Sequence, residues 1–196
     1  HGFDTKAWFV VDGDHPQSPE DADGWIITGS KHGAYEDHDW IPPLEDFIRA
    51  VYADGRPMVG VCFGHQVIAQ ALGGRVVKFD QGWAVGHTDY QIDGEDMRLL
   101  AWHQDQVVER PEGAKVIGSN AFCENAALLY DNRILTIQPH PEFDSEIIEK
   151  LIEIRGKGVV EPDRLAAAHS TQDAPHDSLI FVDRISRFFR EGASHG

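Results

Sequence analysis

The stretch PMVGVCFGHQVIAQALGG, from Pro57 to Gly74, passes from an apolar run into a helical pattern, with Cys62 at the joint. A short apolar run bounded by turn residues is typical of a strand buried on both faces of a parallel sheet. The residues after Cys62 predict a helix that ends at the glycine pair Gly73 and Gly74. A strand that leads directly into a helix indicates an α/β fold, because the helix must cross back over the sheet before the next strand.

The same alternation precedes this stretch. Two apolar runs closed by glycine, Ala7 to Gly13 and Gly24 to Gly29, predict two more buried strands. Between Pro43 and Gly55 apolar residues recur at the spacing of one helix face, and Gly55 ends the helix. The residues on that face are Leu44, Phe47, Ile48 and Val51.

From Arg75 to Gln138 the pattern changes to short strands without long helices. Turn residues at Asp93-Gly94 and Asp131-Asn132 predict hairpins. We therefore expect this part of the chain to add antiparallel strands to the sheet.

Helical patterns return near the end of the chain. We expect helices from Asp144 to Arg155 and from about Asp177 to Arg190, with a short helix after Pro162 between them. The inward face of the last helix is predicted to carry Leu179, Val182, Ile185 and Phe189.

Together these elements predict an α/β fold with an open, mostly parallel sheet of the Rossmann or flavodoxin type, helices on both faces and an antiparallel extension. A chain of 196 residues, 41% of them hydrophobic, suits a single domain over residues 1–196. The sequence begins with His1 instead of methionine, which leaves room for a first strand of the sheet ahead of it.

The charge balance restricts the partners. With 33 acidic and 17 basic residues the net charge is -16, so nucleic acid and anionic membrane surfaces would be repelled. Neither a membrane span nor a signal peptide is visible, which favours the cytoplasm. Cys62 and Cys123 form neither a disulfide framework nor a zinc motif, so we expect reduced thiols and predict no metal and no cofactor.

Cys62 lies in the pattern G-x-C-x-G, between Gly60 and Gly64. Where a strand turns sharply into a helix with a nucleophile at the apex, the backbone comes too close for side chains at the flanking positions. The apex residue projects from the carboxyl edge of the sheet, where ligands bind in open α/β folds. The positive end of the helix favours the thiolate, so the pattern predicts a nucleophile rather than a small core residue.

A nucleophilic thiol needs a base, and the segment TIQPHPEF supplies His140 and Glu142. Residues i and i+2 of an extended segment point to the same side, so Glu142 can accept the proton of one imidazole nitrogen while the other faces the thiol. Pro139 and Pro141 stiffen the segment. Cys62, His140 and Glu142 are therefore predicted to act as nucleophile, base and orienting group.

The segments GVCFGHQVIAQALGG and PHPEF resemble the nucleophile and His-Pro-Glu segments of the class I glutamine amidotransferases, and the similarity runs from about Trp25 to Phe143. Free-standing members that resemble the glutaminase domain of GMP synthetase are the most similar. The resemblance implies a Rossmann-like sheet and hydrolysis of the glutamine side-chain amide to glutamate and ammonia through a γ-glutamyl thioester. The ammonia would normally pass to a synthetase partner.

By position, the resemblance implies an oxyanion hole made by the backbone N–H groups of Ser30 and Phe63. The family has Ser-Gly-Gly-Pro where this chain has TGSK, from Thr28 to Lys31. A serine can serve there if its backbone adopts the conformation of the family glycine.

The resemblance also implies a set of substrate-binding residues, some of them from the segment WHQDQV. In that segment Trp102 stands where the family has serine, which puts free glutamine in doubt as the substrate. A wider aromatic wall would admit a γ-glutamyl peptide or conjugate, as in the plant γ-glutamyl peptidases that resemble this group. The predicted substrate-binding residues are Gly29, Gln66, His103, Gln104 and Asp105.

Three other features have simpler interpretations. The loop from Lys31 to Trp40 contains metal-ligand types, but its spacing fits no strong metal motif, and it is interpreted as a polar loop beside the pocket, with Tyr35 able to touch a substrate. His65 is interpreted as structural and Cys123 as a packing residue. The ligand types in the loop are His32, Glu36, Asp37, His38 and Asp39.

Three functions therefore remain open. The first is hydrolysis of glutamine, and the second is hydrolysis of γ-glutamyl peptides or conjugates. The third is a partner-dependent amidotransferase subunit, inactive alone, that delivers ammonia to a synthetase. No ATP-binding motif is present in the sequence, so any acceptor chemistry would belong to another polypeptide.

Overall fold

The computed structural model describes residues 2–192. A seven-stranded sheet with the order β1-β2-β9-β8-β7-β4-β5 forms the centre, and a separate two-stranded sheet contains β3 and β6. The strands of the large sheet are β1 (Trp25–Ile27), β2 (Met58–Val61), β4 (Ala84–Ile92), β5 (Glu95–His103), β7 (Lys115–Ser119), β8 (Ala127–Tyr130) and β9 (Ile134–Ile137). The small sheet pairs β3 (Arg75–Lys78) with β6 (Asp105–Glu109).

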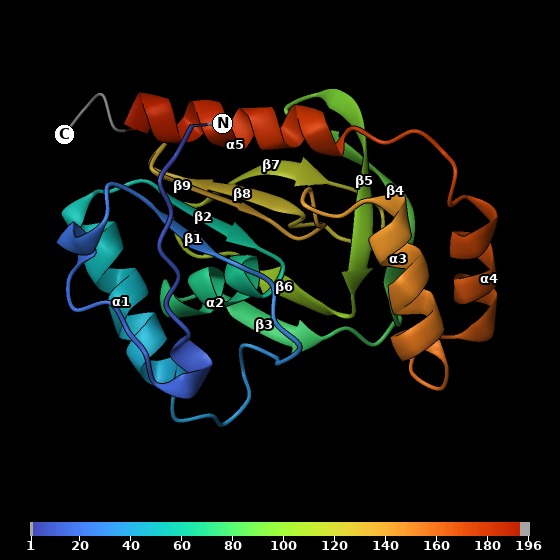
Figure 1. The fold of residues 1–196 in the computed structure, drawn as a ribbon, viewed down its shortest axis with the longest axis horizontal. Helices are drawn as coiled ribbons and strands as arrows, with labels where there is room; N and C mark the ends of the chain where they lie inside the picture. The colour runs from blue at the N-terminus through green and yellow to red at the C-terminus, as the bar shows by residue number, and fades with distance from the viewer. Residues whose placement is uncertain (1, 193–196) are drawn as a thin grey trace.

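The strand directions divide the large sheet into two parts. β1, β2 and β9 are parallel, whereas β8, β7, β4 and β5 add to β9 in antiparallel fashion. Figure 1 shows α5 lying along the sheet, with α3 and α4 at one side. The helices are α1 (Ile41–Asp54), α2 (Phe63–Ala71), α3 (Ser145–Leu151), α4 (Pro162–Ser170) and α5 (Ser178–Gly192).

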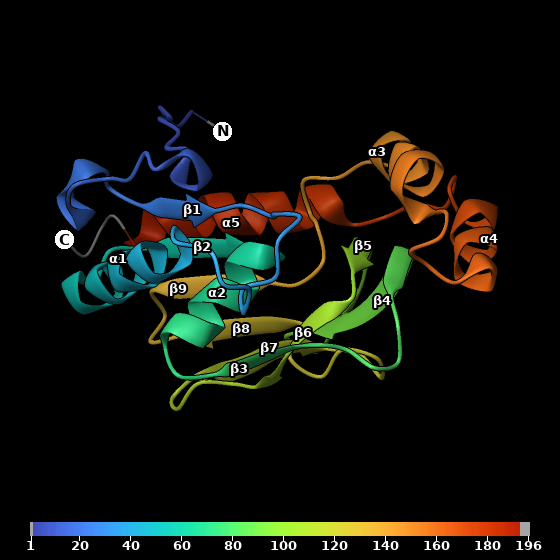
Figure 2. The ribbon, with the colours of Figure 1, turned by 90° about the horizontal axis from the view of Figure 1, so that it is seen from below.

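Short helical segments complete the elements. 3-10 turns occupy Val10–Asp12 and Pro19–Asp21, and a π-helical turn, Ile152–Gly156, follows α3. Figure 2 shows α3 and α4 together beside the ends of β4 and β5, apart from α1 and α2. In the described part of the chain, none of the helices is both long and apolar enough to cross a membrane.

The apolar run of β2 is continuous because the strand is buried on both faces, so side chains that point to either face are apolar. Met58 belongs to a core shared with buried residues of α1 and α2, and the next residue, Val59, belongs to a second core that contains Phe181 of α5. Successive residues of a strand point to opposite faces, so β2 contributes side chains to both cores. The predicted α/β fold with helices on both faces is confirmed, as are the hairpins at Asp93-Gly94 and Asp131-Asn132.

Helix α2 is buried nearly all round. It packs against the large sheet through β2 and β9, against α1, and against β3 and β6 of the small sheet. The sequence pattern did not predict β6, because the segment is short and lies directly after β5. Its pairing with β3 closes a second layer over α2 instead of extending the main sheet.

The strand expected between Ala7 and Gly13 is absent, and that prediction is wrong. The chain there makes a 3-10 turn at Val10–Asp12, and Phe9 and Val11 are exposed. Trp8 contacts the ring of Trp25 with centroids 5.1 Å apart. The apolar run therefore indicates packing of alternate side chains against the edge of the domain rather than a strand.

The predicted face of α5 is wrong at its first turn. Leu179 is 78% exposed, whereas Phe181 is completely buried in the second core. Ile185 and Phe189 pack against that core as predicted. The helix is rotated about its axis so that Phe181 and Ile185, one turn apart, lie on the buried face.

Phe181→Ala is expected to lower the free energy of unfolding by about 3–5 kcal/mol, because it leaves a cavity in the second core. Leu179→Ala, on the same helix, should change it by less than about 0.5 kcal/mol. Urea unfolding followed by far-UV circular dichroism measures both. Equal effects of the two substitutions would contradict this packing of α5.

Candidate active site

The ends of three neighbouring parallel strands bring the predicted site residues together. Gly29 and Ser30 follow β1, Cys62 directly follows β2, and His140 follows β9. The Cys62 backbone N–H donates a hydrogen bond of 2.9 Å to the carbonyl of Ile137, the last residue of β9. Because parallel strands end at the same edge, segments distant in sequence meet there.

Cys62 has the strained backbone of a sharp strand-to-helix turn. Its φ is 52° and its ψ is -105°, a conformation that residues with a side chain rarely adopt. A Cβ at Gly60 would lie 2.6 Å from the carbonyl oxygen of Gly64, and a Cβ at Gly64 would lie 2.0 Å from the carbonyl oxygen of Ile27. Both glycines are therefore required by close backbone contacts, as the G-x-C-x-G pattern predicted.

His140 is held from three directions. Its Nδ1 lies 2.7 Å from Oε1 of Glu142. Its backbone N–H donates to the carbonyl of Leu100 in β5, and the ring of Phe143 stacks on the imidazole with centroids 4.0 Å apart and an interplanar angle of 7°. The buried imidazole therefore has a fixed orientation, with Nε2 left for a partner other than Glu142.

The electrostatics of His140 reflect its contact with Cys62. Burial by itself lowers the pKa of His140, but hydrogen bonds to Cys62 and Glu142 outweigh it and raise the pKa to about 9. The imidazole is therefore protonated at neutral pH, beside the sulfur. A protonated imidazole beside a sulfur nucleophile can donate its proton to a group that binds between them.

The segment after β1 lies against this pair. A Cβ at Gly29 would be 3.0 Å from Cε1 of His140 and 3.7 Å from Cβ of Cys62, so a larger residue at Gly29 would press on the imidazole. Ser30 is the next residue, and its Oγ accepts a hydrogen bond from the backbone N–H of His32. Phe63, the first residue of α2, is buried on the other side of Cys62.

Gln66, Asp105 and Tyr35 form one hydrogen-bonded group. The Gln66 side chain donates to the backbone carbonyl of Asp105 at 3.0 Å and to Oε1 of Gln138 at 3.1 Å. The Tyr35 hydroxyl donates to Oδ1 of Asp105 at 3.1 Å. Burial raises the pKa of Asp105, and burial together with Asp105 raises the pKa of Tyr35 to about 12.

The other two residues of the predicted substrate set have different surroundings. His103 is buried, and burial together with the charge of His140 lowers its pKa to about 3, so it stays neutral. The Gln104 side chain donates to the carbonyl of Phe79, which follows β3. Gln104 therefore ties the turn before β6 to the small sheet.

His65 and Cys123 have the surroundings expected for structural residues. Nδ1 of His65 lies 2.8 Å from Oγ1 of Thr136, and complete burial lowers the pKa of His65 to about 3. Cys123 is also buried, and burial raises the pKa of its thiol to about 12. The structure keeps both side chains as buried neutral groups.

Two contacts at the site were missed by sequence reasoning. Phe143 was seen only as the end of the PHPEF segment, and its stack on His140 depends on the turn made after Pro141. Leu100 carries no chemical signal in the sequence, since its backbone carbonyl holds His140. An aromatic residue close to a predicted catalytic histidine could have indicated the first contact, but nothing in the sequence indicates the second.

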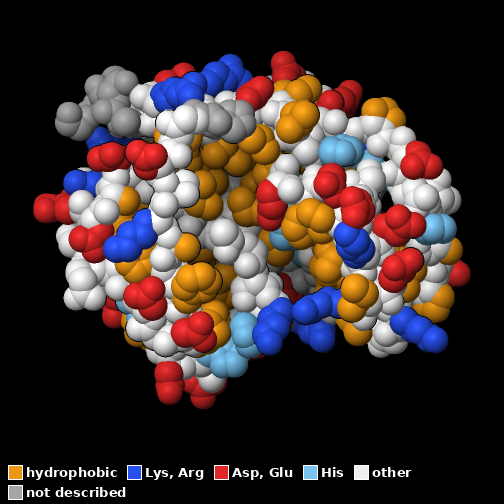
Figure 3. All heavy atoms as spheres, in the orientation of Figure 1, with side chains coloured by type: hydrophobic (Ala, Val, Ile, Leu, Met, Phe, Trp, Pro, Cys, Tyr) orange, Lys and Arg blue, Asp and Glu red, His pale blue; other side chains and the backbone are white. Residues whose placement is uncertain are grey.

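An aromatic pair lies near the bridge between β5 and His140. Trp102 of β5 faces Trp83, with ring centroids 5.8 Å apart. Arg164 of α4 donates hydrogen bonds to the carbonyls of Trp83 and Gln81, so the helical arm of α3 and α4 holds this loop. Figure 3 shows that this face of the molecule is hollowed between the segment after β1 and the helical arm.

Residues 10–153 match the family described as Glutamine amidotransferase class-I, and the chain belongs to that family. The resemblance predicted from the two motifs is confirmed. A crystal structure of a glutamine amidotransferase from Thermotoga maritima has the same fold, with a TM-score of 0.76 at 19% identity over 95% of this chain and 85% of that one.

Two relatives differ in the activity that their names state. Gamma-glutamyl peptidase 4 of Arabidopsis thaliana is 33% identical over 96% of this chain and 82% of its own length. The glutamine-hydrolyzing GMP synthase of Azoarcus sp. is 35% identical over 75% of this chain, but only 29% of the synthase is covered. The family and these relatives support an amidohydrolase enzyme.

Cys62→Ala is expected to lower the pKa of His140 from about 9, because it removes the interaction with Cys62 that raises this pKa, while burial still lowers it and Glu142 still raises it. NMR titration of protein with labelled histidine measures the change. Cys123→Ala is the matched control and should leave the pKa of His140 where it is. An unchanged His140 pKa in Cys62→Ala would contradict the contact between the sulfur and the imidazole.

Proposed function

We propose that this protein hydrolyses the amide bond of γ-glutamyl groups, with Cys62 as nucleophile, His140 as acid and base, and Glu142 as the group that orients His140. One observation carries the proposal: in a class-I amidotransferase fold, a cysteine at a strained strand–helix turn lies beside a buried imidazole whose pKa it raises, and a carboxylate holds that imidazole. The glutamine side chain is the simplest such substrate.

In the first half of the reaction the Cys62 thiolate attacks the carbonyl carbon of the γ-amide. The carbonyl oxygen becomes an oxyanion, and the backbone N–H groups of Ser30 and Phe63 donate to it. As the tetrahedral intermediate collapses, the protonated His140 gives its proton to the leaving nitrogen. Ammonia or an amine departs, and a γ-glutamyl thioester remains on Cys62.

In the second half, water attacks the thioester carbon. The now neutral His140 takes a proton from the water, and Glu142 stabilises the imidazolium that forms again. Cleavage of the carbon–sulfur bond returns the thiolate and releases glutamate. The fixed ring orientation provided by Phe143 and Leu100 keeps the imidazole in place through both proton transfers.

We assign the α-amino and α-carboxylate end of the substrate to the group around Gln66, Asp105 and Tyr35. Gln66 lies one helical turn after Cys62 and is hydrogen-bonded to the backbone at Asp105, so the two are held relative to the sulfur. The Asp105 side chain faces the Tyr35 hydroxyl and offers a carboxylate for an ammonium group. Gly29 leaves the space beside His140 that a bound substrate needs.

A γ-glutamyl peptide or conjugate is the second candidate substrate. We assign the leaving group to the side of the aromatic pair Trp83 and Trp102, because Trp102 lies two residues along β5 from Leu100, which bridges to His140. Aromatic rings there would contact a group larger than ammonia. A relative named gamma-glutamyl peptidase 4 aligns with nearly the whole of this chain. For a synthetase-dependent subunit, the argument is similarity to part of a GMP synthase, and that role predicts weak activity until a partner is added.

Cys62→Ala is expected to reduce hydrolysis roughly 10⁴-fold or more, because it removes the nucleophile. Cys123→Ala, which removes the other thiol, should retain activity because Cys123 is a buried packing residue with no part in the proposed reaction. Glutamate release is measured from glutamine and from γ-glutamyl dipeptides. Full activity in Cys62→Ala would rule out the mechanism. A higher kcat/KM for the dipeptides than for glutamine would show that the preferred leaving group is an amino acid rather than ammonia.

Ser30→Pro is expected to reduce kcat about 100-fold or more, because it removes one of the two backbone donors to the oxyanion. Ser30→Ala keeps that N–H and loses only the hydroxyl, so it should have a much smaller effect. Steady-state kinetics on the preferred substrate, with circular dichroism as a check on folding, separates the two. If both variants lost activity equally, the donor at Ser30 would be the wrong assignment.

A further inference from the structure

The loop between Ser30 and α1 brings two imidazoles and one carboxylate to a single point. Nδ1 of His32 lies 3.2 Å from Oε2 of Glu36, and Nε2 of His38 lies 2.8 Å from the same oxygen. Among the described residues, these three offer ligand atoms that all lie within 4.8 Å of one another. None of the three takes part in the proposed reaction.

We propose that His32, Glu36 and His38 bind one Zn²⁺ ion. Two imidazole nitrogens and one carboxylate oxygen are a common protein ligand set for zinc, with a water in the fourth position. Zinc–ligand bonds of roughly 2.0–2.1 Å in a tetrahedron place neighbouring ligand atoms about 3.3 Å apart. The separations of the two imidazole nitrogens from Oε2 of Glu36, 3.2 and 2.8 Å, are close to that value.

The backbone and an aromatic ring hold the ligands in this arrangement. The His38 backbone N–H donates to the carbonyl of Glu36, and the His32 backbone N–H donates to Oγ of Ser30. The ring of Trp40 stacks on His38 at 5.6 Å and 14° and meets the edge of His32 at 5.6 Å. These contacts hold the backbone of both histidines and the faces of their rings, so that a ring nitrogen of each stays directed at Glu36.

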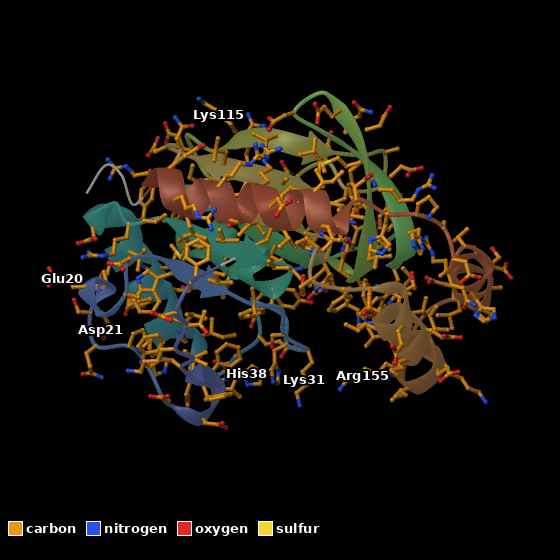
Figure 4. All side chains as sticks on the ribbon, turned by 45° about the horizontal axis from the view of Figure 1, so that its top comes forward. Glu20, Asp21, Lys31, His38, Lys115 and Arg155 are labelled. Carbon is orange, nitrogen blue, oxygen red and sulfur yellow. The ribbon has the colours of Figure 1, made fainter. Side chains whose placement is uncertain are left out.

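The cluster is open to solvent on one side, so an ion can enter. The exposed fractions of the side chains are 22% for His32, 42% for Glu36 and 35% for His38. Figure 3 shows histidine side chains at the lower rim of this face, and Figure 4 labels His38 and Lys31, which both belong to the segment between β1 and α1. Imidazole ligands favour zinc and similar transition metals, whereas Mg²⁺ and Ca²⁺ prefer oxygen ligands.

The bound ion would order the loop from Ser30 to Trp40 at both of its ends, and both ends lie close to Cys62. At the start of the loop the backbone N–H of His32 donates a hydrogen bond to Ser30. At its end the ring of Trp40 packs against Phe63 with centroids 5.6 Å apart. Zinc therefore acts here as an ordering ion for the loop that leads from β1 to α1. The metal site itself does not depend on the proposed hydrolysis.

Without zinc, Glu36 could simply accept hydrogen bonds from both imidazoles in a polar turn. Calorimetric titration with Zn²⁺ tests the difference, on untagged protein carrying Cys62→Ala so that the thiol and His140 do not bind the metal. We expect one ion per chain. His32→Gln, Glu36→Gln and His38→Gln should each weaken zinc binding at least about 10-fold, whereas Asp37→Asn and Asp39→Asn, in the same loop, should not.

Three further measurements keep the result decisive. Circular dichroism without metal checks that each variant folds, and the visible spectrum of added Co²⁺ reports a tetrahedral site that contains nitrogen ligands. Hydrogen exchange of the amides in residues 30–40 should slow when zinc is added. Absence of one-to-one binding, equal affinity in all five loop variants, or binding of Mg²⁺ as tight as that of Zn²⁺ would overturn the proposal.

Discussion

The parallel pairing of β2 with β1 and β9 is the constraint on which the site depends. Because the three strands end at the same edge, the segments that follow them meet as a consequence of the strand register. The hydrogen bond from the Cys62 N–H to the Ile137 carbonyl belongs to that register. The backbone thus places the sulfur of Cys62 next to the imidazole of His140. The attraction between the two groups only adjusts their final positions.

The strained turn at Cys62 needs support from its surroundings. A side chain held at positive φ costs about 1–3 kcal/mol, and such conformations persist only where the structure around them leaves no alternative. Here the buried strand β2 enters the turn and the buried helix α2 leaves it, with α2 covered on several sides. The absence of side chains at Gly60 and Gly64 lets the two elements approach closely enough to force the turn.

Sequence reasoning was strongest where one local pattern determines the structure. The joint at Cys62 and the hairpins follow from glycine and turn residues, and the structure contains them. The pattern failed at Ala7 to Gly13, where an apolar run packs without pairing, and at Leu179, where helix rotation depends on tertiary contacts. The loop from Lys31 to Trp40 was noted for its metal-ligand types but interpreted as a polar loop, because spacing in a loop does not show that the ring nitrogens of His32 and His38 meet at the Glu36 carboxylate.

The attachment of His140 to β5 links the two parts of the sheet. Cys62, the proposed nucleophile, follows a parallel strand, whereas the backbone of His140, the proposed base, is hydrogen-bonded to a carbonyl of the antiparallel hairpin β4–β5. Helix α4 contacts the same hairpin region through the hydrogen bond from Arg164 to Trp83. Local opening of that hairpin would withdraw the imidazole while leaving the thiol in place. The proposed activity would then be lost before the whole domain unfolds, so its loss would report local opening of the β4–β5 hairpin.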